Sequence, residues 1–255
     1  MFRRIIPVLL LSDGGLVKSK NFQDCRYVGD ALNAVRIFSE KEADELVFLD
    51  IEATRRGASP DIEMIKAIAS EAYMPFAYGG GVRTLQQAEN ILRNGAEKIV
   101  LNDAIFSIPH IVEEMTKEFG SQAVVACIDV KRIIFGKYAI FSYKDRTLRK
   151  PDLVTSISLC ENLGCGEIIV QSVDHDGQRT GYDVPSIQRT RKATSLPLVA
   201  LGGARSVEDF RAAFQAGADA VAAGSMFIFW GKYQAVLINY PTSQEIRSIL
   251  HADMH

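Results

Sequence analysis

The sequence lacks any apolar run of about twenty residues, the length that a membrane-spanning helix requires. Its first apolar stretch, Ile5–Leu11, is seven residues long and contains Pro7. The stretch follows Arg3-Arg4 like a short secretion signal, but it leads into a Ser-Asp-Gly-Gly turn without a small-residue cleavage site. We therefore predict a buried strand there, no membrane partner and a cytoplasmic location.

The sequence also has few cysteines and no large excess of charge of either sign. The 29 basic and 31 acidic side chains give a net charge of −2, without the basic excess of a nucleic-acid surface, so we expect no nucleic-acid partner. Four cysteines in 255 residues are too few for a disulfide framework, and their spacing does not suit a metal site. We predict buried reduced thiols at Cys25, Cys127, Cys160 and Cys165.

What the sequence does contain is a regular alternation of strand-like and helix-like segments. The strand-like runs are almost continuously apolar, as in parallel strands that are buried on both faces. Helices are predicted to begin after Asp30, Asp61, Thr84 and Ser206. The alternation, with no break in composition, predicts a single domain, residues 1–255, folded as a (βα)8 TIM barrel. The eight predicted strands are Ile5–Leu11, Glu45–Ile51, Phe76–Tyr78, Lys98–Leu101, Ala123–Val130, Glu167–Ser172, Leu198–Leu201 and Ala220–Ala223.

An internal repeat divides the chain into two halves. Residues Pro75–Phe106 resemble Pro197–Ile228 at an offset of 122, about half the chain and too long for a solenoid unit. The repeat predicts a barrel built from two related four-unit halves. One insertion interrupts it: residues 132–143 are predicted to form a β-hairpin around Gly136-Lys137, followed by a basic loop, Lys144–Lys150.

Small residues follow four of the predicted strands at the end where barrel enzymes bind their ligands. Glycine lets a ligand approach backbone N–H groups, so the duplicated pattern favours two phosphate-binding cradles and a ligand or ions bearing phosphate. The alternative is that these glycines only form tight turns. The predicted cradle residues are Gly80, Gly81 and Asn102 in the first half, and Gly202, Gly203, Gly224 and Ser225 in the second.

Carboxylates at other strand ends are candidates for proton transfer. Asp129 ends the fifth strand and Asp50 the second, while Asp174 and Asp176 follow the sixth. Lys18, in a long polar loop after the first strand, is placed to reach an anion over the mouth. His175 has no second histidine nearby in the sequence, so we expect no metal, and we expect no other cofactor.

Several segments together resemble the cyclase subunit of imidazole glycerol phosphate synthase: RIIPVLLLSDGGLVK, PFAYGGGV, FGSQAVVACIDVKR, GEIIVQSVDHDGQRTGYD and the LGGA/AAGSMF pair. The similarity covers nearly the whole chain. It implies a (βα)8 barrel with half-barrel symmetry, a lyase subunit of a glutamine amidotransferase complex. It also implies a glutaminase subunit on the bottom face that sends ammonia through the barrel.

The resemblance also marks departures at the mouth. The family uses two aspartates for cyclisation; the one ending strand five corresponds to Asp129, whereas the one ending strand one corresponds to Leu10. Leucine cannot transfer a proton, and losing a positioned acid or base costs about 10²–10⁴ in rate. In the first cradle a hydroxyl residue is replaced by Asp103, whose carboxylate would repel phosphate.

At the opposite end the resemblance implies that a ring of charges at the ammonia entrance is kept. Its members are Arg4, Glu45, Lys98 and Glu167, two of each sign. The alternative is that they are ordinary solvated charges at strand starts.

We therefore expect a diverged subunit that binds a glutaminase and conducts ammonia, with cyclase activity lost. The resemblance implies that ammonia then reaches a sugar amidotransferase of surface-polysaccharide (lipopolysaccharide) biosynthesis. Two alternatives stay open: an orthodox cyclase subunit of histidine biosynthesis, and a phosphate-binding module without either activity.

Overall fold

The computed structural model describes residues 3–251, so residues 1–2 and 252–255 of the expected 1–255 domain lie outside the described part. Within residues 3–251 eight parallel strands form a closed barrel, in the order β1, β4, β5, β6, β7, β10, β11 and β12, with β12 returning to β1. All eight strands predicted from the sequence are confirmed. They are β1 (Arg4–Ser12), β4 (Leu46–Asp50), β5 (Phe76–Gly79), β6 (Lys98–Leu101), β7 (Val124–Arg132), β10 (Glu167–Ser172), β11 (Leu198–Leu201) and β12 (Ala220–Ala223).

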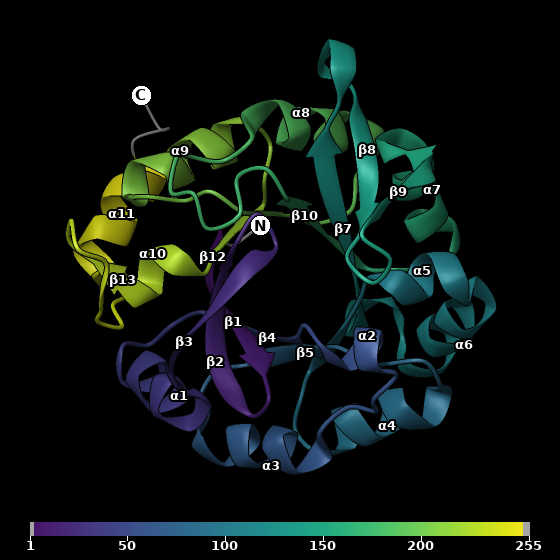
Figure 1. Ribbon diagram of the computed structural model, residues 1–255, viewed down its shortest axis with the longest axis horizontal. Helices are drawn as coiled ribbons and strands as arrows, with labels where there is room; N and C mark the ends of the chain where they lie inside the picture. The colour runs from purple at the N-terminus through teal and green to yellow at the C-terminus, as the bar shows by residue number, and fades with distance from the viewer. Residues whose placement is uncertain (1–2, 252–255) are drawn as a thin grey trace.

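Helices surround the barrel, one after each strand (Figure 1). All four predicted caps stand just before a helix, and Asp30 and Asp61 accept hydrogen bonds from backbone N–H groups three residues on. The outer helices are α1 (Ala31–Glu40), α3 (Ile62–Glu71), α4 (Leu85–Arg93), α6 (Pro109–Phe119), α7 (Leu153–Asn162), α8 (Val184–Ala193), α9 (Val207–Gln215) and α11 (Ser243–His251). No helix in this described part is long and apolar enough to cross a membrane.

Short helices, 3₁₀ turns and strand pairs lie in the loops between the main elements. Short helices follow three strands: α2 (Ala53–Arg56), α5 (Asp103–Ser107) and α10 (Ser225–Ile228), and two 3₁₀ turns are η1 (Ser121–Ala123) and η2 (Ile134–Gly136). Three antiparallel pairings add β2 (Gly15–Lys20) with β3 (Gln23–Asp30), β8 (Tyr138–Ser142) with β9 (Thr147–Asp152), and β13 (Phe229–Trp230) with β14 (Ala235–Val236).

Two segments interpreted as loops are strands instead. The polar segment that carries Lys18 is the β2–β3 hairpin, because Leu10 of β1 pairs with Val17 and extends the sheet beyond the barrel. The basic segment from Lys144 becomes β9 at Thr147, which pairs with Ser142 of β8. β8 in turn pairs with the end of β7, where the hairpin at residues 132–143 was expected. β3 and β9 are mostly exposed and rich in polar residues, so they lack the continuous apolar run that marks the barrel strands.

The core has two layers. One lies between strands and helices and includes Tyr78, Phe38 and Phe210, all fully buried. The other fills the barrel interior, where side chains such as Ile6, Val125 and Val199 form an apolar column. The thiols also divide: Cys127, Cys160 and Cys165 are buried as predicted, whereas Cys25 is exposed, because it lies on the β3 ribbon rather than under a helix.

Thr84 offers a test of how helix α4 is fixed. Its hydroxyl accepts a hydrogen bond from the Gln87 N–H at 3.2 Å, and the Gln87 side chain accepts one from the Thr84 N–H at 3.2 Å. Thr84→Ala removes this cap and should lower the free energy of unfolding by about 1 kcal/mol. Urea unfolding followed by circular dichroism measures the change. Thr180→Ala, at an exposed loop position, is the control; equal midpoints for both variants would contradict the capping role.

Candidate functional site

A wide pocket opens at the carboxyl ends of the strands, with about 980 Å³ of empty space. Asp129 on β7 and Leu10 on β1 both line it. β1 and β7 are four strands apart in either direction around the barrel, so the two residues approach the pocket from opposite walls. One wall therefore presents a carboxyl group where the other presents a hydrocarbon side chain.

Asp129 is 5% exposed and receives a hydrogen bond from the Asn102 amide at 3.0 Å. Burial raises the pKa of Asp129 to about 8, against the opposing effect of that hydrogen bond. At neutral pH the carboxyl group is thus mainly protonated and is better suited to donate a proton than to accept one.

The first predicted cradle is already occupied by protein groups. The Asn102 amide also donates to the Cys127 carbonyl at 2.8 Å. The Asp103 carboxylate lies 2.5 Å from the Arg149 guanidinium and 3.7 Å from the Lys144 amine. Gly80 and Gly81 line the pocket, and a Cβ on Gly80 would lie 2.5 Å from the Asp50 carbonyl oxygen. Backbone packing is thus one reason for a glycine at position 80, and its contact with phosphate stays a prediction.

The second predicted cradle forms an adjoining pocket of about 430 Å³, lined by Gly202, Gly203, Gly224 and Ser225. Leu10, Ser19 and Gln171 line both pockets. Lys18 is buried in it and donates to the Val8 carbonyl at 2.7 Å. Burial lowers the pKa of Lys18 to about 8, while the nearby Asp176 acts in the opposite direction. A Cβ on Gly224 would lie 2.7 Å from the Lys18 amine. This pocket keeps a cation and small residues together.

The remaining predicted carboxylates separate in space. Asp50 lines the wide pocket and accepts from the N–H groups of Glu52 and Ala53 at 3.1 and 3.0 Å. Asp176 lines the second pocket and accepts from the Ser19 hydroxyl at 2.8 Å. Asp174 lines neither pocket; it accepts from the Arg132 N–H at 2.8 Å and fastens the β7–β8 hairpin. Its expected place among the substrate-contacting residues is therefore not supported by the geometry.

Sequence reasoning missed several residues at the mouth. Arg179 lines the second pocket, and its Nε is buried without a hydrogen-bond partner in the described part of the chain. Its place in a glycine-flanked turn, Gly177 to Gly181, was an available signal. Phe22 and Tyr143 line the wide pocket with their ring centroids 5.7 Å apart. These aromatics are 121 residues apart in the chain and carried no local signal.

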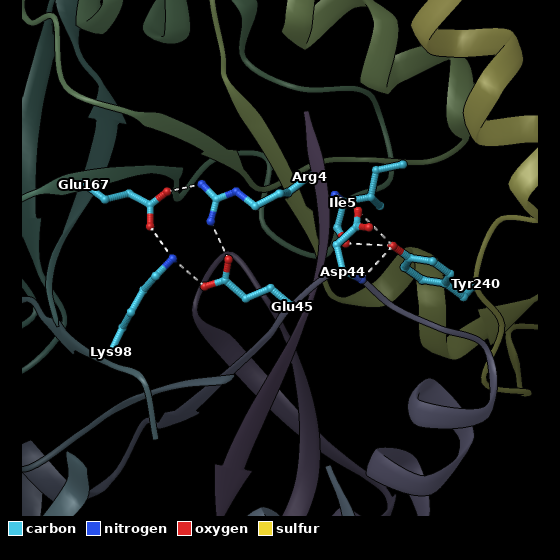
Figure 2. A network of polar contacts seen from close by, with 7 residues as sticks. All are labelled: Arg4, Ile5, Asp44, Glu45, Lys98, Glu167 and Tyr240. Carbon is cyan, nitrogen blue, oxygen red and sulfur yellow. Dashed lines mark hydrogen bonds and ion pairs between the residues drawn. The ribbon is translucent and has the colours of Figure 1, made fainter. Parts of the chain in front are cut away.

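At the amino ends of the strands the four predicted charges meet in a closed ring (Figure 2). Arg4 pairs with Glu45 and Glu167, and Lys98 bridges the same two carboxylates at 2.9 and 3.0 Å. The glutamates are buried, 4% and 6% exposed. Each charge therefore has two partners of opposite sign, which an ordinary solvated charge does not have.

Beside this ring, Tyr240 fastens the chain that follows β14 to the barrel floor. Its hydroxyl donates to the Ile5 carbonyl at 2.9 Å, and the Asp44 carboxylate accepts from the Ile5 N–H at 2.8 Å. Figure 2 shows both contacts next to the ring. They hold the start of β1, and with it Arg4, in place.

The protonated state of Asp129 has a measurable consequence for stability. Because its pKa rises from the ordinary value of 3.8 to about 8, the folded protein holds a proton that the unfolded chain releases between these pH values. The free energy of unfolding should therefore fall as pH rises through this window. Asp129→Asn should flatten the fall by about 3–4 kcal/mol between pH 5 and pH 8.

Chemical denaturation at both pH values checks this. Asp24→Asn, on the exposed β3 ribbon, is the control and should follow the wild-type curve. If Asp129→Asn also follows it, the carboxyl group is ionised in the folded protein.

Comparisons with known proteins agree with this architecture. A model of the family described as "Histidine biosynthesis protein" matches residues 4–234. The "Putative imidazole glycerol phosphate synthase subunit hisF3" of Vibrio vulnificus is 44% identical over 249 residues, covering 97% of this chain and 96% of that protein.

Two further relatives extend the match. A protein of Pseudomonas aeruginosa with the same style of name, hisF2, is 43% identical and covers 94% of this chain and 96% of its own length. The "Imidazole glycerol phosphate synthase subunit HisF" of Exiguobacterium sibiricum is 37% identical, covering 89% of this chain and 91% of its own. The chain therefore belongs to the HisF family of imidazole glycerol phosphate synthase subunits.

Proposed function

We propose that this chain binds a glutaminase subunit at the amino-end face of the barrel and conducts ammonia to the mouth without closing an imidazole ring there. The ammonia is then used by a separate sugar amidotransferase. The observation that carries the proposal is the pairing of Leu10 and Asp129 on opposite walls of one pocket. Cyclisation in this family uses an acid on each wall, and this chain offers only one.

The barrel interior supports passage of a neutral molecule. Between the charged ring and Asp129 the inward side chains are apolar, among them Val47, Val100 and Ile169. An ammonium ion would lose its solvation there, whereas neutral ammonia loses little. The ring below this column, at the barrel floor, is internally neutral because its two cations and two carboxylates pair with one another. It holds no unpaired charge that would trap ammonium.

The ring also supports a gate. Lys98 ends in a single amine on a four-carbon stem, and this amine connects Glu45 to Glu167 across the opening. Swinging this one side chain outward would open a path while Arg4 keeps both carboxylates paired. A docked glutaminase that offers Lys98 another acceptor would favour the open form.

The mouth supports binding of one phosphate rather than two. In the first cradle the nearby cations pair with Asp103, whereas Lys18 and Arg179 line the second cradle. We expect phosphate in the second pocket only. This asymmetry fits a chain whose mouth no longer holds a bis-phosphate for ring closure.

An orthodox cyclase role is the second candidate. Asp129 favours it, because burial gives that group a pKa of about 8, within the range of a working general acid. On that reading the second acid would have to come from elsewhere in the pocket, and Asp50 is the carboxyl group that lines it from β4.

Substitution of Leu10 separates the two candidates. With ammonium salts as the nitrogen source, the wild-type chain should turn over the bis-phosphate substrate of ring closure at least about 10²-fold more slowly than Leu10→Asp. Leu10→Asn is the matched control, since asparagine is polar and close to aspartate in size but has no carboxyl group. Turnover by the wild type as fast as that of an active Leu10→Asp variant would refute our interpretation of Leu10 and favour the orthodox role.

The charged ring is tested by Glu167→Gln in the complex with the glutaminase. Loss of one carboxylate leaves Lys98 with a single carboxylate partner, so the gate should leak. With the sugar amidotransferase present, the amidated sugar formed per glutamine hydrolysed should fall by about twofold or more. Glu71→Gln, in the exterior pair with Arg36, is the control. Added ammonium salts should restore product formation by the ring variant; a defect that persists with ammonium would point to a damaged mouth instead.

A further inference from the structure

The β7–β8 hairpin projects beyond the barrel (Figure 1). β7 runs three residues past Asp129 to Arg132, and Arg132 pairs with Tyr138 of β8. The tip is apolar and open to solvent: Ile134 is 77% exposed and Phe135 is 94% exposed. Phe135 also has φ of +60°, a backbone conformation that is strained for an aromatic residue. A strained, exposed aromatic side chain at a projecting tip is costly unless a partner uses it.

Positive charge is concentrated around this tip. Residues 131–150, which we call the basic hairpin, contain seven lysines or arginines and one aspartate, in a chain whose net charge is −2. Arg149 forms an ion pair with Asp103 inside the mouth, and Arg146 stacks on Tyr143. Lys144 also lies 3.7 Å from Asp103, which leaves Arg132, Lys137, Arg146 and Lys150 as the exposed cations without a carboxylate partner among the ion pairs of the described residues. Such a surface attracts an acidic partner.

The basic hairpin also borders the exit of the barrel. Tyr143 and Lys144 line the wide pocket, and the Arg132 N–H is held by Asp174, which follows β10 at the same end. A protein seated on the tip would therefore stand beside the opening from which ammonia leaves. Ammonia released into water is protonated and lost, so the enzyme that uses it gains by sealing this opening.

We propose that the basic hairpin is the docking site of the enzyme that consumes the ammonia. Ile134 and Phe135 enter an apolar depression on that enzyme, and the surrounding cations meet an acidic rim. The inference rests on the function proposed above and adds the surface through which ammonia is handed on. An anionic membrane would also attract these cations, but a flat bilayer does not follow the concave mouth beside them.

The test measures binding between the glutaminase-loaded chain and a purified sugar amidotransferase from the same organism, by biolayer interferometry. We expect the double variant Ile134→Ser/Phe135→Ser to weaken the dissociation constant by about tenfold or more. Arg132→Glu/Lys137→Glu should weaken it similarly and reduce its salt dependence. The matched controls are Tyr73→Ser, an 89% exposed aromatic residue preceding β5, and Lys66→Glu/Arg93→Glu on α3 and α4.

Formation of amidated sugar from glutamine is recorded in parallel to separate the two proposals. Amidation by the wild type, together with unchanged binding by the tip and charge variants, would overturn the docking site and leave the proposed function standing. No amidation by the wild type, with turnover of the cyclase substrate instead, would overturn the proposed function itself. Vesicles of phosphatidylglycerol and phosphatidylcholine form the last arm. Tip-dependent binding to them, without tip-dependent binding to the amidotransferase, would assign the tip to a membrane and also overturn the docking site.

Discussion

Closure of the barrel by the pairing of β7 with β10 is the constraint on which the other features depend. The two strands match over six consecutive positions, from Val125 opposite Glu167 to Val130 opposite Ser172. This register brings Glu167 to the floor of the barrel and Asp129 to its mouth. It also sets β7 opposite β1, which is why a single leucine on β1 decides whether Asp129 has an acidic counterpart.

Closure also sorts the interior into layers. A neutralised charge ring lies at the amino ends, an apolar column follows, and polar groups reappear at Asp129 and Gln171. The order matters to the function proposed above, in which each layer would act on ammonia differently. In that proposal the charged groups govern entry, the hydrocarbon layer excludes ions, and the mouth hands the molecule on. In this chain the ring and the column are continuous by their contacts, while at the mouth Leu10 faces Asp129 and the Asp103 carboxylate pairs with Arg149.

Much of this arrangement was predictable from the sequence. Continuous apolar runs gave the eight barrel strands because strands buried on both faces leave a strong signal. The charge ring was predicted from the family resemblance, because its four residues stand at strand starts where ordinary solvated charges are equally common, and their contacts follow from barrel closure. Tertiary contacts were not predictable in the same way. The sequence placed Asp103 against phosphate, but it did not reveal that Arg149, 46 residues away, would neutralise it. Asp174 looked like a mouth residue, yet its carboxylate fastens a hairpin whose pairing had no local signal. Arg179 was overlooked because its neighbours are brought together only by the folded loop.

The central claim, that ammonia crosses this barrel and is used by another enzyme, is tested most directly by isotope tracing. The chain is mixed with its glutaminase, the sugar amidotransferase and glutamine labelled with ¹⁵N in the amide, in a buffer containing unlabelled ammonium. The mixture also contains both possible nitrogen acceptors, the sugar substrate of the amidotransferase and the bis-phosphate substrate of ring closure. Mass spectrometry then follows the label. The account predicts undiluted ¹⁵N in the amidated sugar and none in imidazole glycerol phosphate. Label in the imidazole ring, or an amidated sugar whose nitrogen is diluted by the unlabelled ammonium, would contradict it.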